Sequence, residues 1–435
     1  MKNLVTYLLL FCCVPWAFGQ AGHIMQGVGS VNMSMGGAAT GQPLDISGAL
    51  HWNPAAITEF NQDQIRFDLG LFFSSPELRS TAPELDSSGQ PTGNFISGVT
   101  EDDRGSSPLP ALAYKVGSET RHHFGFSAFG ISGFGVTFPE SQTNPINFPQ
   151  EFGGFGRVES SYLLFQVGAA YAYELTDKLS VGVQPTFNMG RLDLIPNPTA
   201  NPNQSGYPST DNPKTAFGFG AQVGVFYNSG TGFKAGASYK TPQSFGDFEF
   251  DNVYPDGSSG SNSFNLDYPA ILSFGAGYSK GHFDLALDYR IVYYENASGF
   301  DEVGWNPQTA SVVGFGWQNI NILSAGIQYK GVRGLPIRLG YTYSSNPIQD
   351  EFAFYSVPAT AIIKNAFQVG LGYELTDKWT IDGVFHYGDS GSATSGPLLN
   401  PRFASPNDPF GAIPGSEVSY DMTTSMVMFG VQYQW

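Results

Sequence analysis

Three basic residues of this sequence, Arg290, Lys364 and Arg191, are candidates for binding an acidic head group. Guanidinium and ammonium groups donate charge-assisted hydrogen bonds to carboxylates, and these bonds are about twice as strong as those between neutral groups. Such a contact matters most where water is scarce. Whether the three cations face such a place depends on the elements that carry them.

The sequence does not indicate catalytic chemistry. It contains no His-Glu-x-x-His, and its six histidines are scattered. The stretches Gly218-Phe219-Gly220 and Gly275-Ala276-Gly277 lie within alternating segments rather than before a helix, so we do not interpret them as nucleotide-binding loops. We therefore expect no enzymatic activity, no cofactor and no metal site.

The composition restricts the class of protein. Of the 435 residues, 13% are charged, 15% are aromatic and 54 are glycine. A chain with about half the usual share of charged residues and so many aromatic ones is neither disordered nor a coiled coil. With 20 Lys+Arg against 37 Asp+Glu, it has no excess of cations to displace counterions, so nucleic acid is not expected as a partner.

Residues 1–19 have the pattern of a secretory signal peptide. A positively charged start is followed by an apolar run over residues 4–16 and by small residues at positions 17 and 19, which a signal peptidase reads. Cleavage before Gln20 would remove both cysteines and leave no disulfide. No later segment approaches the roughly eighteen consecutive apolar residues of a spanning helix, so we do not expect residence in the inner membrane.

The remaining sequence alternates with a period of two, which is typical of β-strands. At the C-terminus, large apolar side chains occupy every second position from Val427 to Trp435, and smaller or polar residues lie between most of them. The same alternation occurs from Phe217 to Tyr227 and from Phe367 to Tyr373. One face of each strand is therefore apolar, and the other is small and polar.

About fourteen such segments follow one another, an even number within the range of bacterial outer-membrane barrels. Connections of about three to seven residues, typical of hairpin turns, alternate with connections of about twenty to thirty-five residues. Short turns at one end and long loops at the other favour an outer-membrane barrel over a soluble β-protein. We predict an all-β fold, a 14-stranded antiparallel transmembrane β-barrel in the outer membrane of a Gram-negative bacterium, with strands centred on Phe67, Leu112, Phe126, Val167, Val183, Val223, Ala237, Phe274, Leu287, Ala325, Leu339, Val369, Ile381 and Phe429.

If the apolar faces point outward, twelve ionisable residues point into the lumen: Arg66, Asp68, Lys115, Lys234, Lys240, Asp284, Asp288, Arg290, Arg338, Lys364, Asp382 and His386. Most of them would form ion pairs there. Those near the periplasmic ends are better placed to anchor an internal segment: Arg66, Lys115, Lys234 and Arg338. Arg290 and Lys364 lie in the upper halves of their strands, where they could meet a carboxylate arriving from outside. Alternation points Arg191 outward unless Gly190 forms a β-bulge.

Residues 20–61 do not follow the strand pattern. This segment is rich in Gly, Ala, Ser and Met, and it contains Asn53-Pro54-Ala55. About forty residues with small side chains could pack inside a barrel lumen. In its Gly/Ala-rich start, its Asn-Pro-Ala element, its strand number and its terminal aromatic residue, the whole mature chain resembles the long-chain fatty acid transporter family of the outer membrane (FadL/OMPP1/TodX). Of these features, Asn53-Pro54-Ala55 in its glycine-rich context is the specific motif.

The resemblance implies that residues 20–61 form a hatch within the lumen of a barrel made by residues 62–435. It also implies uptake of hydrophobic compounds, long-chain fatty acids first, with lateral release through a gap that a kink of the third strand opens in the wall. Gly130, Gly133 and Gly135 of that strand fit such a kink, because glycine within a strand often marks a bulge. Expected partners of the monomeric barrel are hydrophobic small molecules, outer-membrane lipid and lipopolysaccharide.

Two other functions are open at this point. A general diffusion porin would show a large steady ion conductance, which the predicted hatch disfavours. A barrel that binds or shuttles cargo in type IX secretion is the second alternative, because relatives of the family in that system share the glycine-rich start and the Asn-Pro-Ala element. Such a protein would co-purify with secreted cargo. The sequence alone does not identify the solute.

Overall fold

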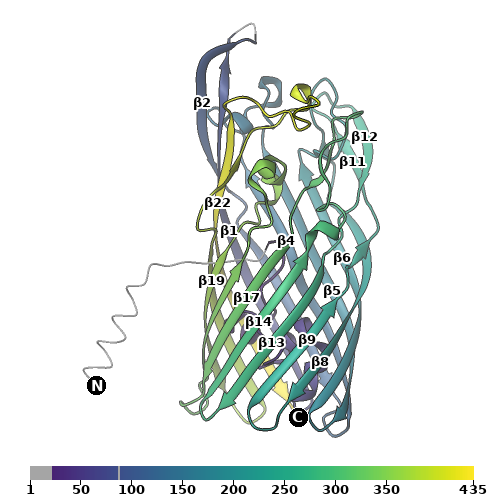
Figure 1. Ribbon diagram of the computed structural model, residues 1–435, viewed down its shortest axis with the longest axis vertical. Coiled ribbons are helices and arrows are strands. Elements are labelled where there is room, and N and C mark those ends of the chain that lie inside the picture. The colour runs from purple at the N-terminus through teal and green to yellow at the C-terminus, as the bar shows by residue number, and fades with distance from the viewer. Residues whose placement is uncertain (1–21, 87–88) are drawn as a thin grey trace, which may run out of the picture.

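Long antiparallel strands form the wall of this protein, as the computed structural model shows for residues 22–86 and 89–435 (Figure 1). The predicted signal peptide lies outside these residues. Within them, fourteen strands pair in sequence order, and β1 pairs with β22 from Gln64–Gln434 to Thr81–Glu417, which closes the barrel. The predicted fold class is confirmed. The strands of the wall are β1 (Gln64–Leu85), β3 (Ser106–Val116), β4 (His122–Phe138), β5 (Val158–Thr176), β6 (Leu179–Ile195), β8 (Lys214–Asn228), β9 (Phe233–Lys240), β13 (Ala270–Lys280), β14 (Phe283–Tyr293), β17 (Ile320–Tyr329), β18 (Ile337–Ser344), β19 (Asn365–Glu374), β20 (Trp379–Asp389) and β22 (Glu417–Gln434).

The two faces of each strand differ as the period of two requires. In β1, Phe67, Leu69 and Leu71 are each nearly half exposed on the outside of the barrel, whereas Arg66 and Asp68 between them are buried. An outward apolar band and a polar interior are typical of barrels that face lipid. The alternation also places eleven of the twelve predicted lumenal ionisable residues in buried positions.

The two ends of the barrel differ in their connections. Short turns and the C-terminus lie at the lower end in Figure 1, and the long connections lie at the upper end. The upper connections carry the smaller elements: β2 (Pro91–Glu101), β7 (Ser209–Thr210), β10 (Ser244–Phe245), β11 (Phe248–Val253), β12 (Ser259–Phe264), β15 (Val303–Trp305), β16 (Val312–Phe315), β21 (Thr394–Gly396), and the 3-10 helices η3 (Pro145–Asn147), η4 (Gln150–Phe152), η5 (Tyr294–Asn296), η6 (Asp350–Ala359) and η7 (Pro401–Phe403). These loops cover the upper lumen.

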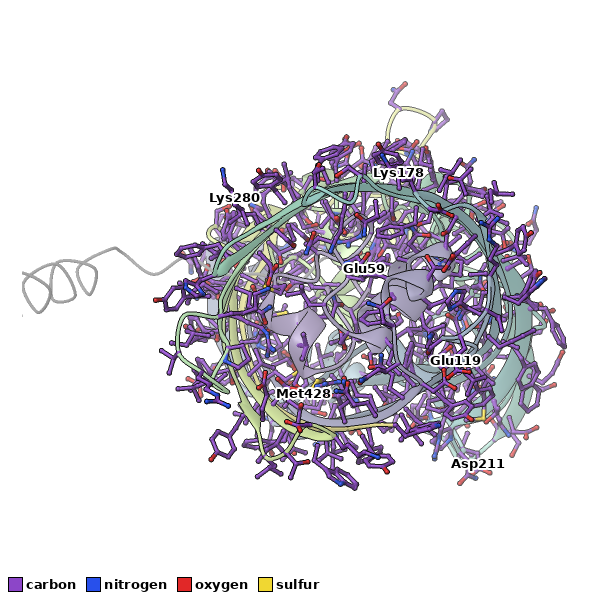
Figure 2. All side chains as sticks on the ribbon, turned by 90° about the horizontal axis from the view of Figure 1, so that it is seen from below. Glu59, Glu119, Lys178, Asp211, Lys280 and Met428 are labelled. Atoms are coloured by element: carbon purple, nitrogen blue, oxygen red, sulfur yellow. The ribbon has the colours of Figure 1, made fainter. Side chains whose placement is uncertain are left out.

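The N-terminal segment lies inside the barrel. It contains α2 (Ser30–Ser34), α3 (Ile46–Trp52) and the 3-10 helix η2 (Pro54–Glu59), and its helices are almost entirely buried. Seen from below, these helices lie within the ring of strands, with Glu59 on the inner side (Figure 2). None of the helices in the described residues is long and apolar enough to cross a membrane.

Candidate functional site

Buried carboxylates of the wall hold the N-terminal segment in place. Asp68 Oδ1 accepts hydrogen bonds from the backbone N–H and the hydroxyl of Ser30, at 2.9 and 2.8 Å. Asp288 Oδ2 accepts from the backbone N–H groups of Ala39 and Thr40, at 2.9 and 2.8 Å. Charge-assisted bonds of this kind, made away from water, fix the backbone of the segment against two distant strands.

Three of the four predicted anchors contact this segment directly. Arg66 donates to Ser30 Oγ at 2.8 Å, Lys115 donates to the Phe60 carbonyl at 2.8 Å, and Lys234 pairs with Glu59 at 2.6 Å. The fourth, Arg338, instead pairs with Asp382 at 2.7 Å. The lower lumen is therefore an ionic and hydrogen-bonded support for residues 30–60.

The Asn53-Pro54-Ala55 element packs against the wall at positions where the strands carry glycine. Asn53 Nδ2 donates to the carbonyls of Thr40 and Val225, at 2.9 and 3.0 Å. A Cβ at Gly224 or Gly236 would overlap the Asn53 side chain. The inward glycines of the alternating strands thus provide the space that this motif needs to approach the wall.

Arg290 lies in the lumen as predicted; its Nη1 and Nη2 bond to the protein, and its Nε has no partner. Its guanidinium donates to Asp288 at 2.6 Å, to the Gly37 carbonyl at 2.8 Å and to Ser324 Oγ at 3.2 Å. It also lies 3.6 Å from the centroid of the Trp52 ring. Arg290 therefore contacts the N-terminal segment, which corrects the expectation that it is placed to meet a carboxylate arriving from outside.

The other two predicted binding residues lie away from Arg290. Lys364 comes just before β19, is only half-buried, and donates to Ser392 Oγ at 2.8 Å, so it does not belong to the fully buried residues of the lumen. Arg191 is exposed on the outside of β6, and the register stays regular through Gly190, which pairs with Leu164. Without a bulge, the period of two turns Arg191 away from the lumen, so the structure does not support it as a lumenal ligand.

Lys240 is a lumenal lysine that was predicted to point inward, with no role of its own. It is 1% exposed, and its ammonium has one hydrogen bond, of 3.4 Å, to Gln166 Oε1. No ion pair of the described residues includes it. His51 of the N-terminal segment is close enough for Lys240 and Arg290 to help burial lower its pKa, and neither of its ring nitrogens has a partner. This part of the lumen therefore holds a buried lysine without an acidic partner.

An aromatic cage surrounds His23 near the start of the described chain. The imidazole stacks on Phe300 with ring centroids 4.8 Å apart, and its Nδ1 lies 2.7 Å from the Tyr294 hydroxyl. Four further rings complete the cage within 6.4 Å: Phe134, Tyr162, Tyr268 and Trp317. The hydroxyls of Tyr162 and Tyr268 and the Nε2 of His23 are buried without a partner. An apolar, ring-lined space with few paired polar atoms suits a hydrophobic ligand.

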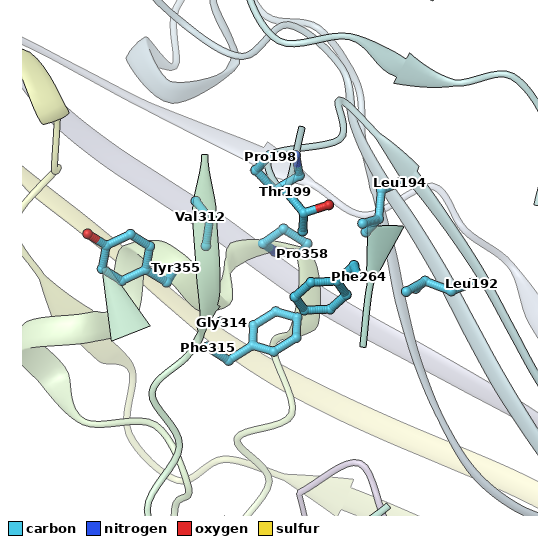
Figure 3. Close-up of a pocket in the computed structure, with 10 residues that line it drawn as sticks. All are labelled: Leu192, Leu194, Pro198, Thr199, Phe264, Val312, Gly314, Phe315, Tyr355 and Pro358. Carbon is cyan, nitrogen blue, oxygen red and sulfur yellow. The ribbon is translucent and has the colours of Figure 1, made fainter. Parts of the chain in front are cut away.

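A second apolar space lies above the cage, under the long loops (Figure 3). Its cavity volume is about 20 Å³, and apart from Thr199 and Tyr355 its lining residues carry no polar side chain. Phe315 belongs to both spaces, because it lines this pocket and contacts Phe300 and Trp317 of the cage, with ring centroids 5.6 and 5.8 Å apart.

The wall is interrupted beside the cage. The β3–β4 ladder ends at the pair Ala111–Phe129, although β4 continues to Phe138. In its pairing with β5, β4 shifts register between Gly130 and Ser132, so a bulge lies at the predicted kink. The lateral role of Gly130, Gly133 and Gly135 stays a proposal, but the irregular backbone lies where these glycines are.

Where the β3–β4 ladder stops, backbone groups of β4 form hydrogen bonds with the N-terminal segment instead. Met25 N–H donates to the Ile131 carbonyl, and Gly133 N–H donates to the His23 carbonyl, both at 3.1 Å. On the opposite edge, Pro108 and Pro110 of β3 have no N–H group to leave unpaired. Unpaired backbone groups are costly in a membrane, so both features allow the ladder to stop here. These two prolines are the signal in the sequence from which the end of the β3–β4 ladder could have been predicted.

A pocket beside the end of the β3–β4 ladder, here called the lateral opening, lies between the cage and the outer side of the wall. Its cavity volume is about 50 Å³, it is partly open to the surroundings, and its lining includes Phe134 and Tyr162 of the cage together with Phe72 and the outward-facing Leu163. The cage therefore shares aromatic residues with the upper pocket on one side and with the lateral opening on the other, and His23 lies in the cage between them. In the described part of the chain, no group of three His, Cys, Asp or Glu side chains could hold a metal.

Comparison with known proteins places this arrangement among outer-membrane barrels. The profile of a family described as "Outer membrane protein transport protein (OMPP1/FadL/TodX)" matches residues 13–435. The toluene transporter TodX of P. putida has a similar structure, with a TM-score of 0.67 at 16% identity over 94% of this chain and 99% of that chain. A FadL homologue of Pseudomonas aeruginosa has a TM-score of 0.69 at 13% identity over 95% and 99% of the two chains.

A third similar structure is the toluene transporter TbuX of Ralstonia pickettii, with a TM-score of 0.59 at 16% identity over 94% of this chain and 99% of that chain. At these identities the structures show a common fold. A search of curated proteins finds no sequence match.

Proposed function

This chain belongs to the outer membrane protein transport family (OMPP1/FadL/TodX), and we propose that it takes up hydrophobic compounds along its aromatic path and releases them sideways through the β3–β4 opening. Family membership makes it an outer-membrane transport protein of a Gram-negative bacterium rather than an enzyme. The route and the solute are the proposal.

One observation carries the proposed route: the three apolar spaces share aromatic residues. Phe315 joins the upper pocket to the cage, and Phe134 and Tyr162 join the cage to the lateral opening. Below the cage, charged and polar contacts fill the lumen around residues 30–60. An apolar solute gains by moving from ring to ring and loses by entering that charged region, so the lateral opening is the favourable exit.

In this proposal the aromatic cage is the binding place of the solute, and the imidazole of His23 fills it while no solute is bound. The ring of His23 fills a cage whose other members are aromatic, and it leaves three buried polar atoms unpaired there. A hydrophobic molecule that displaced it would keep the ring contacts and release the imidazole to water. The N-terminal residues 23–25 would then also leave the edge of β4, next to the exit.

Long-chain fatty acids are the first substrate class that we propose. Lys240 is the reason for proposing fatty acids, because the carboxylate of a bound fatty acid would stabilise the charged form of a buried lysine that has no acidic partner. We therefore propose Lys240, rather than Arg290, Lys364 or Arg191, for this role. Neutral aromatic hydrocarbons are the second class, because the cage consists of rings, and TodX and TbuX are described as toluene transporters.

The route is tested by narrowing the opening. Gly130→Val and Gly133→Val add side chains on the outward side of β4, and at Gly133 the new Cβ would lie 2.8 Å from the Tyr162 carbonyl. We expect the double variant to fold and keep its heat-modifiable gel mobility, while uptake of both a fatty acid and toluene falls. The matched control is Gly383→Val, where the new Cβ meets the Phe429 ring at an ordinary 3.4 Å. Normal uptake by a folded double variant would refute lateral release.

A further inference from the structure

Arg104 lies between β2 and β3, at the edge of the lateral opening. Its Nη1 donates to the Ser160 carbonyl at 2.6 Å, and its Nη2 donates to Ser161 Oγ at 3.0 Å, both on β5. To reach β5, the guanidinium crosses β4 over Gly135, where a Cβ would overlap it. The missing side chain of Gly135 thus allows a cation to lie in the lining of the opening.

The backbone around Arg104 is fixed to both sides of the interrupted wall. Asp102 Oδ1 accepts from the Thr137 N–H of β4 at 2.5 Å, and Asp103 N–H donates to the Thr137 carbonyl at 2.9 Å. Asp102 N–H donates to the Pro76 carbonyl of β1 at 3.2 Å. These bonds close the wall above the opening, so Arg104 is held at its upper rim.

The charge of Arg104 has no acidic partner. No ion pair within residues 22–86 and 89–435 includes it, and its two side-chain hydrogen bonds go to neutral acceptors. The nearest acids are otherwise engaged: Asp102 accepts from backbone N–H groups, and Glu159 pairs with Arg157 at 2.7 Å. Since a guanidinium has five N–H donors, three are left for a ligand.

The rest of the opening suits an alkyl chain. Phe72, Leu109 and Leu163 contribute apolar surface to its lining, and Leu163 is 40% exposed on the outside of the barrel. An amphipathic molecule leaving through the opening could place its chain along these residues and its head group at the rim. The lateral opening therefore has an apolar part, formed by Phe72, Leu109 and Leu163, and a cationic part, formed by Arg104.

We propose that Arg104 is an exit site for the carboxylate of a long-chain substrate. The inference rests on the proposed lateral release and adds the recognition of an acidic head group at the opening. The carboxylate binds the free guanidinium N–H donors while the alkyl chain moves past Leu163 into the bilayer. Because the head group is held at the rim, the molecule enters the outer leaflet with its chain first and its charge at the membrane surface.

The test is site-resolved photolabelling of the full-length barrel in bilayers. The probes are a sixteen-carbon carboxylate and the matching primary alcohol, each with a diazirine next to the head group. In the unaltered protein we expect the carboxylate to label the segments around Arg104 and Ser161 about tenfold more than the alcohol, as one charge-assisted hydrogen bond allows. Arg104→Met should remove this preference, and Arg104→Lys should keep part of it. Arg121→Met, in the β3–β4 turn, is the matched control and should leave it unchanged.

The outcomes separate this inference from the proposed route. If both probes label the opening equally, or if Arg104→Met keeps the preference, Arg104 is not a carboxylate site although lateral release stands. If neither probe labels the opening while both label the cage, lateral release itself fails. A preference that is lost when lipopolysaccharide is added would assign Arg104 to lipid phosphate and overturn the proposal.

Discussion

The guanidinium of Arg290 lies 3.6 Å from the centroid of the Trp52 ring, so a cation of the wall holds an aromatic residue of the N-terminal segment. Both side chains are almost fully buried, and a cation over an indole contributes about 2 kcal/mol or more when water is excluded. The same guanidinium donates to the Gly37 carbonyl. Arg290 therefore joins two parts of the internal segment to β14.

Replacing Arg290 should loosen the internal segment. Arg290→Met removes one partner of a buried ion pair and leaves Asp288 with the backbone N–H groups of Ala39 and Thr40. We expect a loss of roughly 3 to 5 kcal/mol in the free energy of unfolding, measured by urea titration in lipid vesicles. The double variant Arg290→Met/Asp288→Asn should recover part of that loss, since it leaves no unpaired charge. Equal losses in both variants would contradict this explanation.

Deleting residues 20–61 should open the lumen. The segment fills the lower barrel and provides the partners of Asp68 and Asp288. We expect the truncated barrel to insert into planar bilayers with a higher steady ion conductance than the full chain. A channel that stays closed would show that the segment does not block the pore.

Lys240 and Lys364 should differ in their effect on fatty-acid binding. Lys240 is buried without an acidic partner, whereas Lys364 is half-buried and bonded to Ser392. Lys240→Met should weaken the binding of a long-chain fatty acid about tenfold to a hundredfold and leave its methyl ester nearly unaffected, because only the acid carries a charge. Lys364→Met should change neither. A loss of both ligands with Lys240→Met would make this residue a support of the fold.

Acid should release His23 from its cage. Burial lowers the pKa of His23 to about 3, while a released imidazole titrates at about 6.5. Above about pH 6.5 the imidazole is neutral in both states; as the pH falls below that value, only the released form gains a proton. The caged state should therefore lose about 1.4 kcal/mol per pH unit between about pH 6.5 and 3.

A spin label at Met25, introduced through Met25→Cys in a mature chain that is predicted to have no other cysteine, would report this release. Its mobility should rise between pH 7 and pH 5. In a second variant that also carries His23→Phe, mobility should not change with pH, because phenylalanine does not titrate. A pH response that persists with His23→Phe would assign it to another group.

The alternation of apolar and polar residues along the sequence is a local property, and much of this structure could be predicted from it. Which side chain points outward depends on neighbouring residues in the strand, so the strand count, the segregation of turns and loops, and the burial of Arg66, Asp288 and Arg290 could be predicted from the sequence. The glycine-rich stretch around Gly130 likewise indicated where β4 is irregular. These are local properties of the chain.

Only the tertiary structure decided which lumenal residues meet. His23 and Tyr294 are 271 positions apart, and Arg290 meets Trp52 and Gly37 because of the path that the N-terminal segment takes through the barrel. Lys364 lies one residue before β19, and only the structure shows that its ammonium bonds to Ser392, which follows β20. Alternation gives the direction of a side chain but neither its height in the barrel nor the partner across the lumen, since those depend on how distant strands pair and close.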